Sequence, residues 1–297
     1  MSKSSWTIGS VRITRVEESS TTLAAEDLFA GATTEGLARY RSWLKPFVDA
    51  DDRLIISMQT LLVETDGKKI VVDTCVGPAA PAAFAGIVIA GSPFLDDLAS
   101  VGFDRESVDY VVCTHLHFDH IGWNTIAEGD SFVPTFPNAR YIVTRDEWEA
   151  FSKSLADTGG EIDFYGLRES VQPLESAGLL DLVEPGYRVT DQVWLEGTPG
   201  HSSGHVSVRI DSGDESALIT GDATHHPVQW AEPGWSAHAD ADQVQSTATR
   251  RRLLSEHADS PILILGTHYP TPCAGYLVTG PDGCRFEAAG NEHTLFR

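Results

Sequence analysis

Basic residues are scarce in this chain of 297 residues. Lys and Arg total 21 against 43 Asp and Glu, which gives a formal net charge of −22. A field of that sign repels a phosphate backbone, so nucleic acid is not expected as a substrate or partner. The basic triplet at 250–252 lies in a predicted helix, and we interpret it as part of a solvated face.

Long apolar runs and paired cysteines are also missing. No run reaches the roughly 18 apolar residues that a membrane-spanning helix needs, so no membrane segment is expected. The start, Met-Ser-Lys-Ser-Ser-Trp-Thr, has no apolar signal-peptide region. We therefore expect a cytoplasmic protein, in which the four cysteines, which form no CxxC pair, stay reduced.

What the chain does contain is enough apolar material for a folded core. The apolar fraction is 41%, with seven Trp, and neither a repeat nor a low-complexity linker is evident. A length of 297 residues fits one large α/β domain, so we expect a single domain over 1–297.

Two segments look irregular. The first is an N-terminal extension at 20–52 that carries Phe29, Tyr40, Trp43 and Phe47, and the second is 79–94, rich in Ala, Pro and Gly. Large apolar patches rarely face water without a purpose. We therefore expect both segments to wall the substrate pocket or to form a dimer contact.

Hydrophobic periodicity predicts two groups of strands with helices between them. The strands are expected at 11–16, 55–64, 69–73, 109–113 and 140–144, and then at 192–198, 205–210, 217–220, 261–265 and 276–279. Helices are expected at 94–101, 145–155, 165–177 and 241–257, with Pro173 able to break the third. This order favours an α/β fold of two sheets with helices on their outer faces.

Two of these helices have more specific predictions. Thr144 is expected to cap 145–155 at its N-terminus, with Glu147 as the capping-box partner. In 241–257, one packed face is expected to contain Val244, Ala248, Arg251 and Leu254.

The most informative stretch is Thr114-His-Leu-His-Phe-Asp-His120, directly after a predicted strand. His115 and His117 are two apart in an extended segment, so both can point to one side. Asp119 and His120 follow where the chain turns. Two imidazoles can hold one ion, and a carboxylate with an imidazole a second. These ligand types suit Zn²⁺ and accept Mn²⁺, Fe²⁺ or Co²⁺.

Further ligands are expected from later strand ends. His201 lies in a Gly-rich turn, Asp222 ends the run Leu-Ile-Thr-Gly-Asp, and His268 follows Leu-Ile-Leu-Gly-Thr. Strand ends that meet at one sheet edge are a usual way for α/β enzymes to assemble a site.

The complete set resembles the metallo-β-lactamase superfamily. All seven ligand positions of that family are filled between about residues 57 and 269, and Val71-Val-Asp73-Thr resembles its early aspartate motif. The seven are His115, His117, Asp119, His120, His201, Asp222 and His268. The resemblance implies an αβ/βα sandwich of two mixed sheets with the metals at one edge.

The same resemblance implies how the ligands divide. His115, His117 and His201 would hold the first of two Zn²⁺ ions, and Asp119, His120 and His268 the second. Asp222 and a hydroxide would bridge them. Asp119 would also shuttle a proton, and Asp73 and His205 are candidates for orienting the ligand imidazoles.

Individual positions separate branches of the family. His117 stands where flavodiiron oxygen reductases have Glu, and Asp222 stands where classical B1 β-lactamases have Cys. Acyl-homoserine lactonases have Tyr three residues after the bridging Asp, whereas this chain has His225. Segment 222–229 is more similar to methyl-parathion hydrolases and broad lactonases or esterases. Extension 20–52 resembles the arm of those relatives, which implies a homodimer.

We therefore expect a hydrolase that opens a lactone or cleaves a small ester. His225 is the candidate hydrogen-bond donor to the substrate oxygen, although it could instead bond a ligand carboxylate. The alternatives are hydrolysis of a phosphotriester, a β-lactam or a thioester. Two further alternatives are a metal-binding protein without catalysis and an iron redox protein. His226 is expected near the site, and His238, His257 and His293 are interpreted as surface or core residues.

Overall fold

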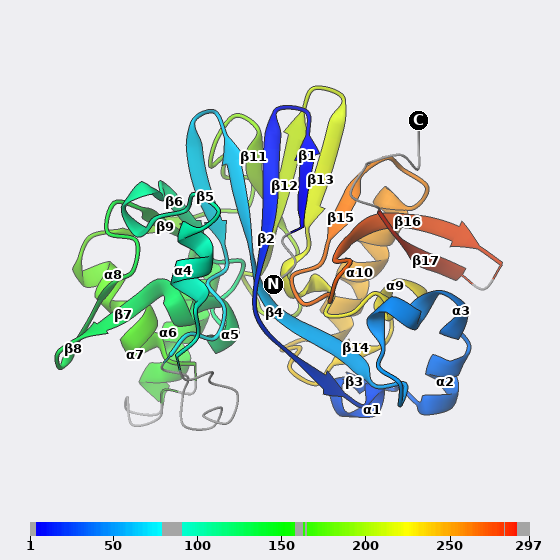
Figure 1. The fold of residues 1–297 in the computed structure, drawn as a ribbon. Helices are drawn as coiled ribbons and strands as arrows, with labels where there is room; N and C mark the ends of the chain where they lie inside the picture. The colour runs from blue at the N-terminus through cyan, green and yellow to red at the C-terminus, as the bar shows by residue number, and fades with distance from the viewer. Residues whose placement is uncertain (1–3, 79–90, 158–162, 164, 282, 290–297) are drawn as a thin grey trace.

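Two mixed sheets pack face to face at the centre of the computed structural model, and helices cover their outer sides (Figure 1). The structure describes residues 4–78, 91–157, 163, 165–281 and 283–289. The layers confirm the expected αβ/βα sandwich. Within those residues, no helix has the length and apolar character needed to cross a membrane.

The first sheet has seven strands in the order β1-β2-β4-β5-β6-β9-β10. The first three neighbouring pairs are antiparallel, and the pairs among β5, β6, β9 and β10 are parallel. The strands are β1 (Ser5–Ile8), β2 (Val11–Leu23), β4 (Leu54–Thr65), β5 (Lys68–Val72), β6 (Tyr110–Val112), β9 (Arg140–Thr144) and β10 (Leu180–Val183).

The second sheet has six strands in the order β11-β12-β13-β15-β16-β17. Only β13 and β15 pair in parallel among these neighbours. The strands are β11 (Val193–Gly197), β12 (Val206–Ser212), β13 (Glu215–Ile219), β15 (Leu263–Leu265), β16 (Ala274–Gly280) and β17 (Gly283–Ala288).

The longer helices lie outside the sheets. The side of the first sheet carries α4 (Phe94–Ala99), α6 (Arg145–Asp157), α7 (Leu167–Ser170) and α8 (Gln172–Ser176), and the second sheet is covered by α10 (Gln243–His257) (Figure 1). Other short helices and strands are η1 (Lys45–Phe47), η3 (Arg105–Ser107), α5 (Phe118–Ile121), η4 (Gly122–Asn124), β7 (Thr125–Glu128), β8 (Ser131–Pro134), η5 (Gly221–Ala223) and α9 (Val228–Ala231).

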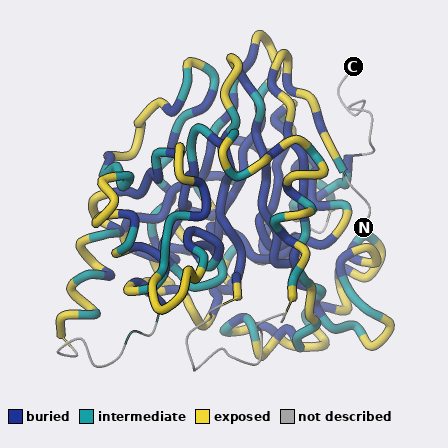
Figure 2. Tube along the Cα trace, turned by 60° about the vertical axis from the view of Figure 1, so that its left-hand side comes forward, coloured by how far each residue is buried: buried dark blue, intermediate teal, exposed yellow. Residues whose placement is uncertain are grey.

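Alternation along the central strands creates two cores. On β4, Leu61 and Val63 face the second sheet, whereas Leu62 faces the outer helices, as the period of two in a strand requires. Burying such a side chain stabilises the fold by about 1.5–3 kcal/mol. Figure 2 shows the result, with the buried residues along the central strands and the exposed ones at hairpin tips and outer helices.

The N-terminal extension is folded rather than exposed. It forms α1 (Ala25–Leu28), β3 (Phe29–Ala30), α2 (Thr34–Ala38) and α3 (Arg41–Leu44), and β3 pairs with β14 (Ser236–Ala237). Phe29, Tyr40 and Phe47 are buried in the main core. These aromatic side chains therefore pack inside the fold of their own chain. Residues 79–90 of the other irregular segment lie outside the described residues.

Several helix predictions need correction. Segment 165–177 is two short helices, because Pro173 begins a new turn in α8 after Val171 leaves helical geometry. In α10, Val244 is 81% exposed, and the buried residues are Ser246, Thr249, Arg250, Leu253 and His257. The predicted packed face is therefore wrong.

The predicted capping box is also replaced by other contacts. The Thr144 hydroxyl donates to the Gly204 carbonyl, and the Glu147 carboxylate accepts from Leu116 N–H and Gly204 N–H. Both side chains therefore reach loops from other parts of the chain instead of capping their own helix.

Candidate metal centre

The chain brings all seven candidate ligands to one edge of the sandwich. The strands β5, β6 and β9 are parallel, so the residues that follow them, including the 115–120 motif after β6, lie at the same edge. In the second sheet, β13 and β15 are parallel, and Asp222 and His268 follow them closely. His201 follows β11, which the antiparallel pairing through β12 orients in the same direction as β13.

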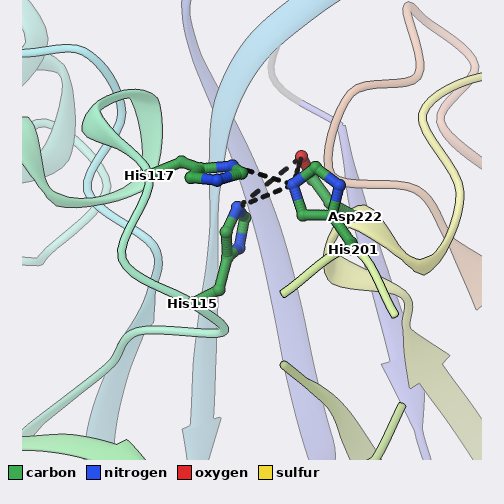
Figure 3. A group of neighbouring side chains, drawn as sticks. All are labelled: His115, His117, His201 and Asp222. Carbon is green, nitrogen blue, oxygen red and sulfur yellow. Dashed lines mark hydrogen bonds and ion pairs between the residues drawn. The ribbon is translucent and has the colours of Figure 1, made fainter. Parts of the chain in front are cut away.

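Three imidazoles and a carboxylate form the first cluster. His201 Nε2 lies 3.2 Å from His115 Nε2 and 2.8 Å from His117 Nδ1. Asp222 Oδ2 is 3.3 Å from His201 Nε2 and 3.8 Å from His115 Nε2. Figure 3 shows the four side chains pointing toward one another, with His115 and His117 from one segment and His201 and Asp222 from two others.

The second cluster lies on the other side of the same carboxylate. His120 Nε2 and His268 Nε2 are 3.1 Å apart. Asp119 Oδ2 lies 3.8 Å from His120 Nε2 and 3.6 Å from His268 Nε2. Asp222 Oδ1 is 3.4 Å from His120 Nε2 and 3.2 Å from His268 Nε2. Each oxygen of Asp222 therefore faces a different histidine set.

The donor atoms fit divalent cations. Asp222 is 2% exposed, and its Oδ1 accepts no hydrogen bond although it is buried. A buried, unsatisfied anionic oxygen is costly unless a cation meets it. Imidazole nitrogens and carboxylate oxygens within 4.8 Å of one another in both groups are suitable ligands for zinc-like ions.

Electrostatics differ between the two clusters. Burial lowers the pKa of His117 to about 4, and it also lowers the pKa values of His115 and His201 well below their usual range. These rings therefore favour the neutral form, which keeps a lone pair for a metal ion. For His120, burial also opposes the charge, but Asp222 and Asp73 outweigh it and raise the pKa. The second cluster thus favours positive charge, as a cation site should.

Contacts behind the ligands fix which ring nitrogen faces the centre. The Nδ1 atoms of His120 and His201 each lie 2.9 Å from a carboxylate, Asp73 Oδ2 and Asp240 Oδ1 respectively. His268 Nδ1 lies 2.8 Å from the Ser57 carbonyl oxygen. Holding Nδ1 in this way turns Nε2 inward and sets the ring angle.

Of the two carboxylates behind the ligand histidines, Asp73 was predicted from the sequence and Asp240 was not. Asp73 does orient the His120 ring, as expected. His205 does not orient an imidazole through a hydrogen bond: its Nε2 accepts from the Asp222 backbone N–H at 2.8 Å. Asp240 was not predicted, because it stands in a loop with no motif around it, far from His201 in sequence.

His225 stands beside both clusters. Its Nε2 lies 3.1 Å from Asp222 Oδ2, and its ring is stacked on His268 with 5.8 Å between centroids. The edge of Phe29 contacts it, and its backbone N–H donates to Gln229 Oε1. His225 is therefore held firmly at the position where the sequence placed it.

The remaining histidines have other contacts. His226 Nε2 bonds the Phe47 carbonyl and so anchors the N-terminal extension. His257 is buried on α10, and exposed His238 lies near the Glu26 carbonyl. His293 lies outside the described residues.

A cavity of about 590 Å³ opens onto the two clusters. Ligand candidates form its floor, and apolar side chains form much of its wall. Its lining contains no Lys or Arg among the residues that the structure describes. The lining residues are Leu23, Leu28, Ile56, Met58, His117, Phe118, Asp119, Tyr165, His201, Asp222, His225, His238, Ala239, Asp240, Ala241 and His268. Leu23 and Leu28 come from extension 20–52, so that segment does wall the pocket.

Comparison with known families agrees with this geometry. The model of the metallo-beta-lactamase superfamily matches residues 59–268, which is most of the chain and a range that contains all seven candidate ligands. This chain belongs to the metallo-beta-lactamase superfamily. The family and fold expected from the sequence are thereby confirmed.

Several curated relatives are N-acyl homoserine lactonases. AttM of Agrobacterium fabrum is 33% identical over 173 residues, which cover 55% of this chain and 60% of AttM. AiiA of Bacillus thuringiensis subsp. kurstaki is 28% identical over 218 residues, covering 69% of this chain and 78% of AiiA. The chain thus spans about 60% of the length of the first curated relatives that it matches.

Solved structures share the fold over nearly the whole chain. The hydrolase AbOPH of the beta-lactamase superfamily has a TM-score of 0.79 and 22% identity, covering 97% of both chains. The dizinc quorum-quenching lactonase AidC has a TM-score of 0.74 and 21% identity, also covering 97% of both. At these identities, the likeness shows the common fold.

A buried cation supports the first cluster from behind, which corrects the solvated-face interpretation for Arg250, whereas Arg251 is exposed and Arg252 partly exposed. Arg250 is fully buried, and its Nη1 lies 3.4 Å from Asp240 Oδ2, whose other oxygen faces His201. The guanidinium also donates to the Pro233 carbonyl and to the hydroxyls of Ser246 and Ser236.

Replacing Arg250 by Met is expected to destabilise the protein by about 3–5 kcal/mol, because it leaves the buried Asp240 carboxylate without its cation. Urea unfolding with metal in fixed excess measures the change. Arg251→Met is the matched control, since Arg251 is exposed on the same helix and should shift stability by less than about 0.5 kcal/mol. Equal midpoints for the two variants would contradict the role given to Arg250.

Proposed function

We propose that this protein is a metal-dependent hydrolase that opens a lactone or cleaves a small, neutral carboxylic ester. One observation carries the proposal: a largely apolar cavity, with no Lys or Arg among its described lining residues, ends at two His/Asp clusters that share one carboxylate. Family membership and the lactonase relatives support the same reaction class.

Seven residues would hold two divalent ions, with Zn²⁺ as the proposed metal. His115, His117 and His201 would bind the first ion, Asp119, His120 and His268 the second, and Asp222 both. When bound, two such ions supply a hydroxide nucleophile near neutral pH and polarise the scissile carbonyl.

The protein's own side chains would position the substrate and move the proton. Asp119 is partly exposed at the cavity floor, so its carboxylate can carry a proton between the nucleophile and the leaving alkoxide. His225 Nε2 faces the same floor and would donate a hydrogen bond to the carbonyl or leaving oxygen. The apolar wall would bind the alkyl part and exclude water.

The lining of the cavity argues for a neutral substrate. Asp119, Asp222 and Asp240 line it, and no described Lys or Arg does. Against the wall away from the metal ions, a substrate carboxylate, such as that of a cephalosporin, would lose hydration without gaining a Lys or Arg partner. This disfavours the β-lactam alternative.

Rates should therefore rise with alkyl chain length on a series of γ-lactones. Each added methylene that enters the apolar wall contributes about 0.8 kcal/mol, or about fourfold in kcat/KM, until the cavity is filled. The control is a pair of ester substrates with the same scissile bond, one of which ends in a methyl ester and the other in a free carboxylate. The substrate with the free carboxylate should have the lower kcat/KM. A flat chain-length profile, or faster turnover of a cephalosporin or phosphotriester in the same panel, would refute the proposed substrate class.

We also infer a homodimer, on the resemblance of extension 20–52 to the arm of dimeric relatives. The extension packs on its own chain through β3 and β14 and leaves α2 and α3 at the outside of the fold (Figure 1). Sedimentation equilibrium at micromolar protein measures the assembly, and a monodisperse monomer would count against a dimer.

A further inference from the structure

Two buried side chains that are not candidate ligands each tie down the loops of one cluster. We propose that Glu147 and Gln59 are positioning residues, each of which sets the affinity of one metal ion: Glu147 that of the first cluster and Gln59 that of the second. The proposal rests on the dinuclear centre proposed above.

Glu147, at the start of α6, connects the two loops that carry the first cluster. Its Oε1 accepts from Leu116 N–H at 3.0 Å, between His115 and His117 in sequence. Its Oε2 accepts from the Ser202 hydroxyl at 2.7 Å and Gly204 N–H at 3.0 Å, directly after His201. One carboxylate thus joins all three histidine-bearing positions of this cluster.

The cost of burying Glu147 indicates a specific role. The residue is 1% exposed, and burial raises its pKa, while three hydrogen bonds from neutral donors oppose that rise. A Cβ on Gly204 would lie 2.3 Å from the Glu147 backbone nitrogen, so only glycine lets the His201 loop approach α6 this closely. The loop and the carboxylate therefore fit each other tightly.

Gln59, on β4, holds the bend that carries His268. Its amide Nε2 donates both hydrogens, one to the Gly266 carbonyl at 2.8 Å and one to the Tyr269 carbonyl at 3.0 Å. These carbonyls bracket His268 in sequence. Ser57 of the same strand donates its N–H to the His268 carbonyl at 2.9 Å.

Arg15 fixes the direction of that amide. Its Nε donates to Gln59 Oε1, and Arg15 is only 4% exposed, so the oxygen of the amide is held on the β2 side and the nitrogen on the His268 side. The bend itself is compact, because a Cβ on Gly266 would meet the Tyr269 ring at 2.1 Å. The two sets of hydrogen bonds around Glu147 and Gln59 share no residue.

The test is a pair of variants in the full chain, Glu147→Gln and Gln59→Met. Glu147→Gln replaces one accepting oxygen with an N–H₂ group, which then faces an N–H or O–H donor with no acceptor between them. Gln59→Met keeps the side-chain volume but leaves the Gly266 and Tyr269 carbonyls without their donor. Metal-free protein is titrated with Co²⁺ by absorption and with Zn²⁺ against a chelator. His117→Ala and Asp119→Ala identify which step belongs to which cluster.

We expect each variant to weaken one step by about 10–100-fold, the usual effect of changing a group that holds a metal ligand. Glu147→Gln should weaken the step lost in His117→Ala, and Gln59→Met the step lost in Asp119→Ala, so each is the control for the other. Circular dichroism checks that each variant folds. If Gln59→Met does not fold, Gln59→Glu replaces it, and if Glu147→Gln does not fold, Glu147→Asp replaces it.

Equal weakening of both steps by either variant, or no change in either, would overturn the assignment. Failure of the dinuclear centre is distinguishable, because the unmodified protein would then bind fewer than two ions before any variant is considered. If it binds two, the titrations decide the roles of Glu147 and Gln59 alone.

Discussion

Replacing Asp222 by Ala is expected to remove both metal ions and all measurable hydrolysis. Its Oδ2 faces the first histidine cluster and its Oδ1 the second, so this one carboxylate offers an oxygen to each. Without the carboxylate, the inward Nε2 atoms of His115 and His201 would have only imidazole neighbours at the centre. His120 would lose the main anionic group that favours positive charge beside it. The effect should therefore exceed that of losing any ligand of a single cluster.

The measurement is elemental analysis after dialysis, paired with turnover of the best lactone or ester. The unmodified protein should contain close to two ions per chain and Asp222→Ala close to none. Asp214→Ala is the matched control, because Asp214 is exposed in the hairpin before β13. One ion or fewer in active unmodified protein would sink the dinuclear centre, and retention of one ion by Asp222→Ala would show that the carboxylate does not serve both.

The candidate ligands could be recognised from the sequence because their positions depend on local structure. Three histidines and an aspartate directly follow β6, and His201, Asp222 and His268 each follow a strand that periodicity reveals. In an α/β fold, residues after parallel strands meet at one edge whatever the details of packing. Strand ends therefore predicted a shared edge, and the resemblance to the metallo-β-lactamase superfamily implied which residues at that edge are the ligands.

The supports behind the ligands could not be recognised, because tertiary contacts determine them. Glu147 matched a capping box in sequence, yet its carboxylate bonds the loops that follow β6 and β11. Asp240 and Arg250 pair inside the protein, so α10 buries a polar face, with Thr249 bonding the Pro199 carbonyl. Apolar periodicity has no means of indicating such a face.

Polar residues also kept hydrophobic periodicity from predicting parts of the sheets. β2 runs from Val11 to Leu23, but its second half contains Glu, Ser and Thr and includes an irregularity between Glu17 and Ser19, so only 11–16 looked like a strand. β10 was missed because Asp181 interrupts its apolar run; in the fold, that carboxylate pairs with Arg140 on β9. Neighbouring strands thus supply the partners that make these residues acceptable in a sheet.

His225→Phe should lower turnover by about 100-fold or more while both ions stay bound, if the imidazole donates a hydrogen bond in the transition state. The side chain lines the cavity beside the candidate ligands, and Phe29, His268 and Gln229 fix its position, so Phe can occupy the space without a donor. His225→Tyr, which restores a donor, should recover part of the rate. The loss should appear in kcat more than in KM, because the bond strengthens as charge develops on the oxygen.

The alternative role of His225 is to bond Asp222, whose Oδ2 lies 3.1 Å from His225 Nε2. Loss of metal in place of rate would favour that alternative, and unchanged kinetics with both ions retained would remove His225 from the mechanism.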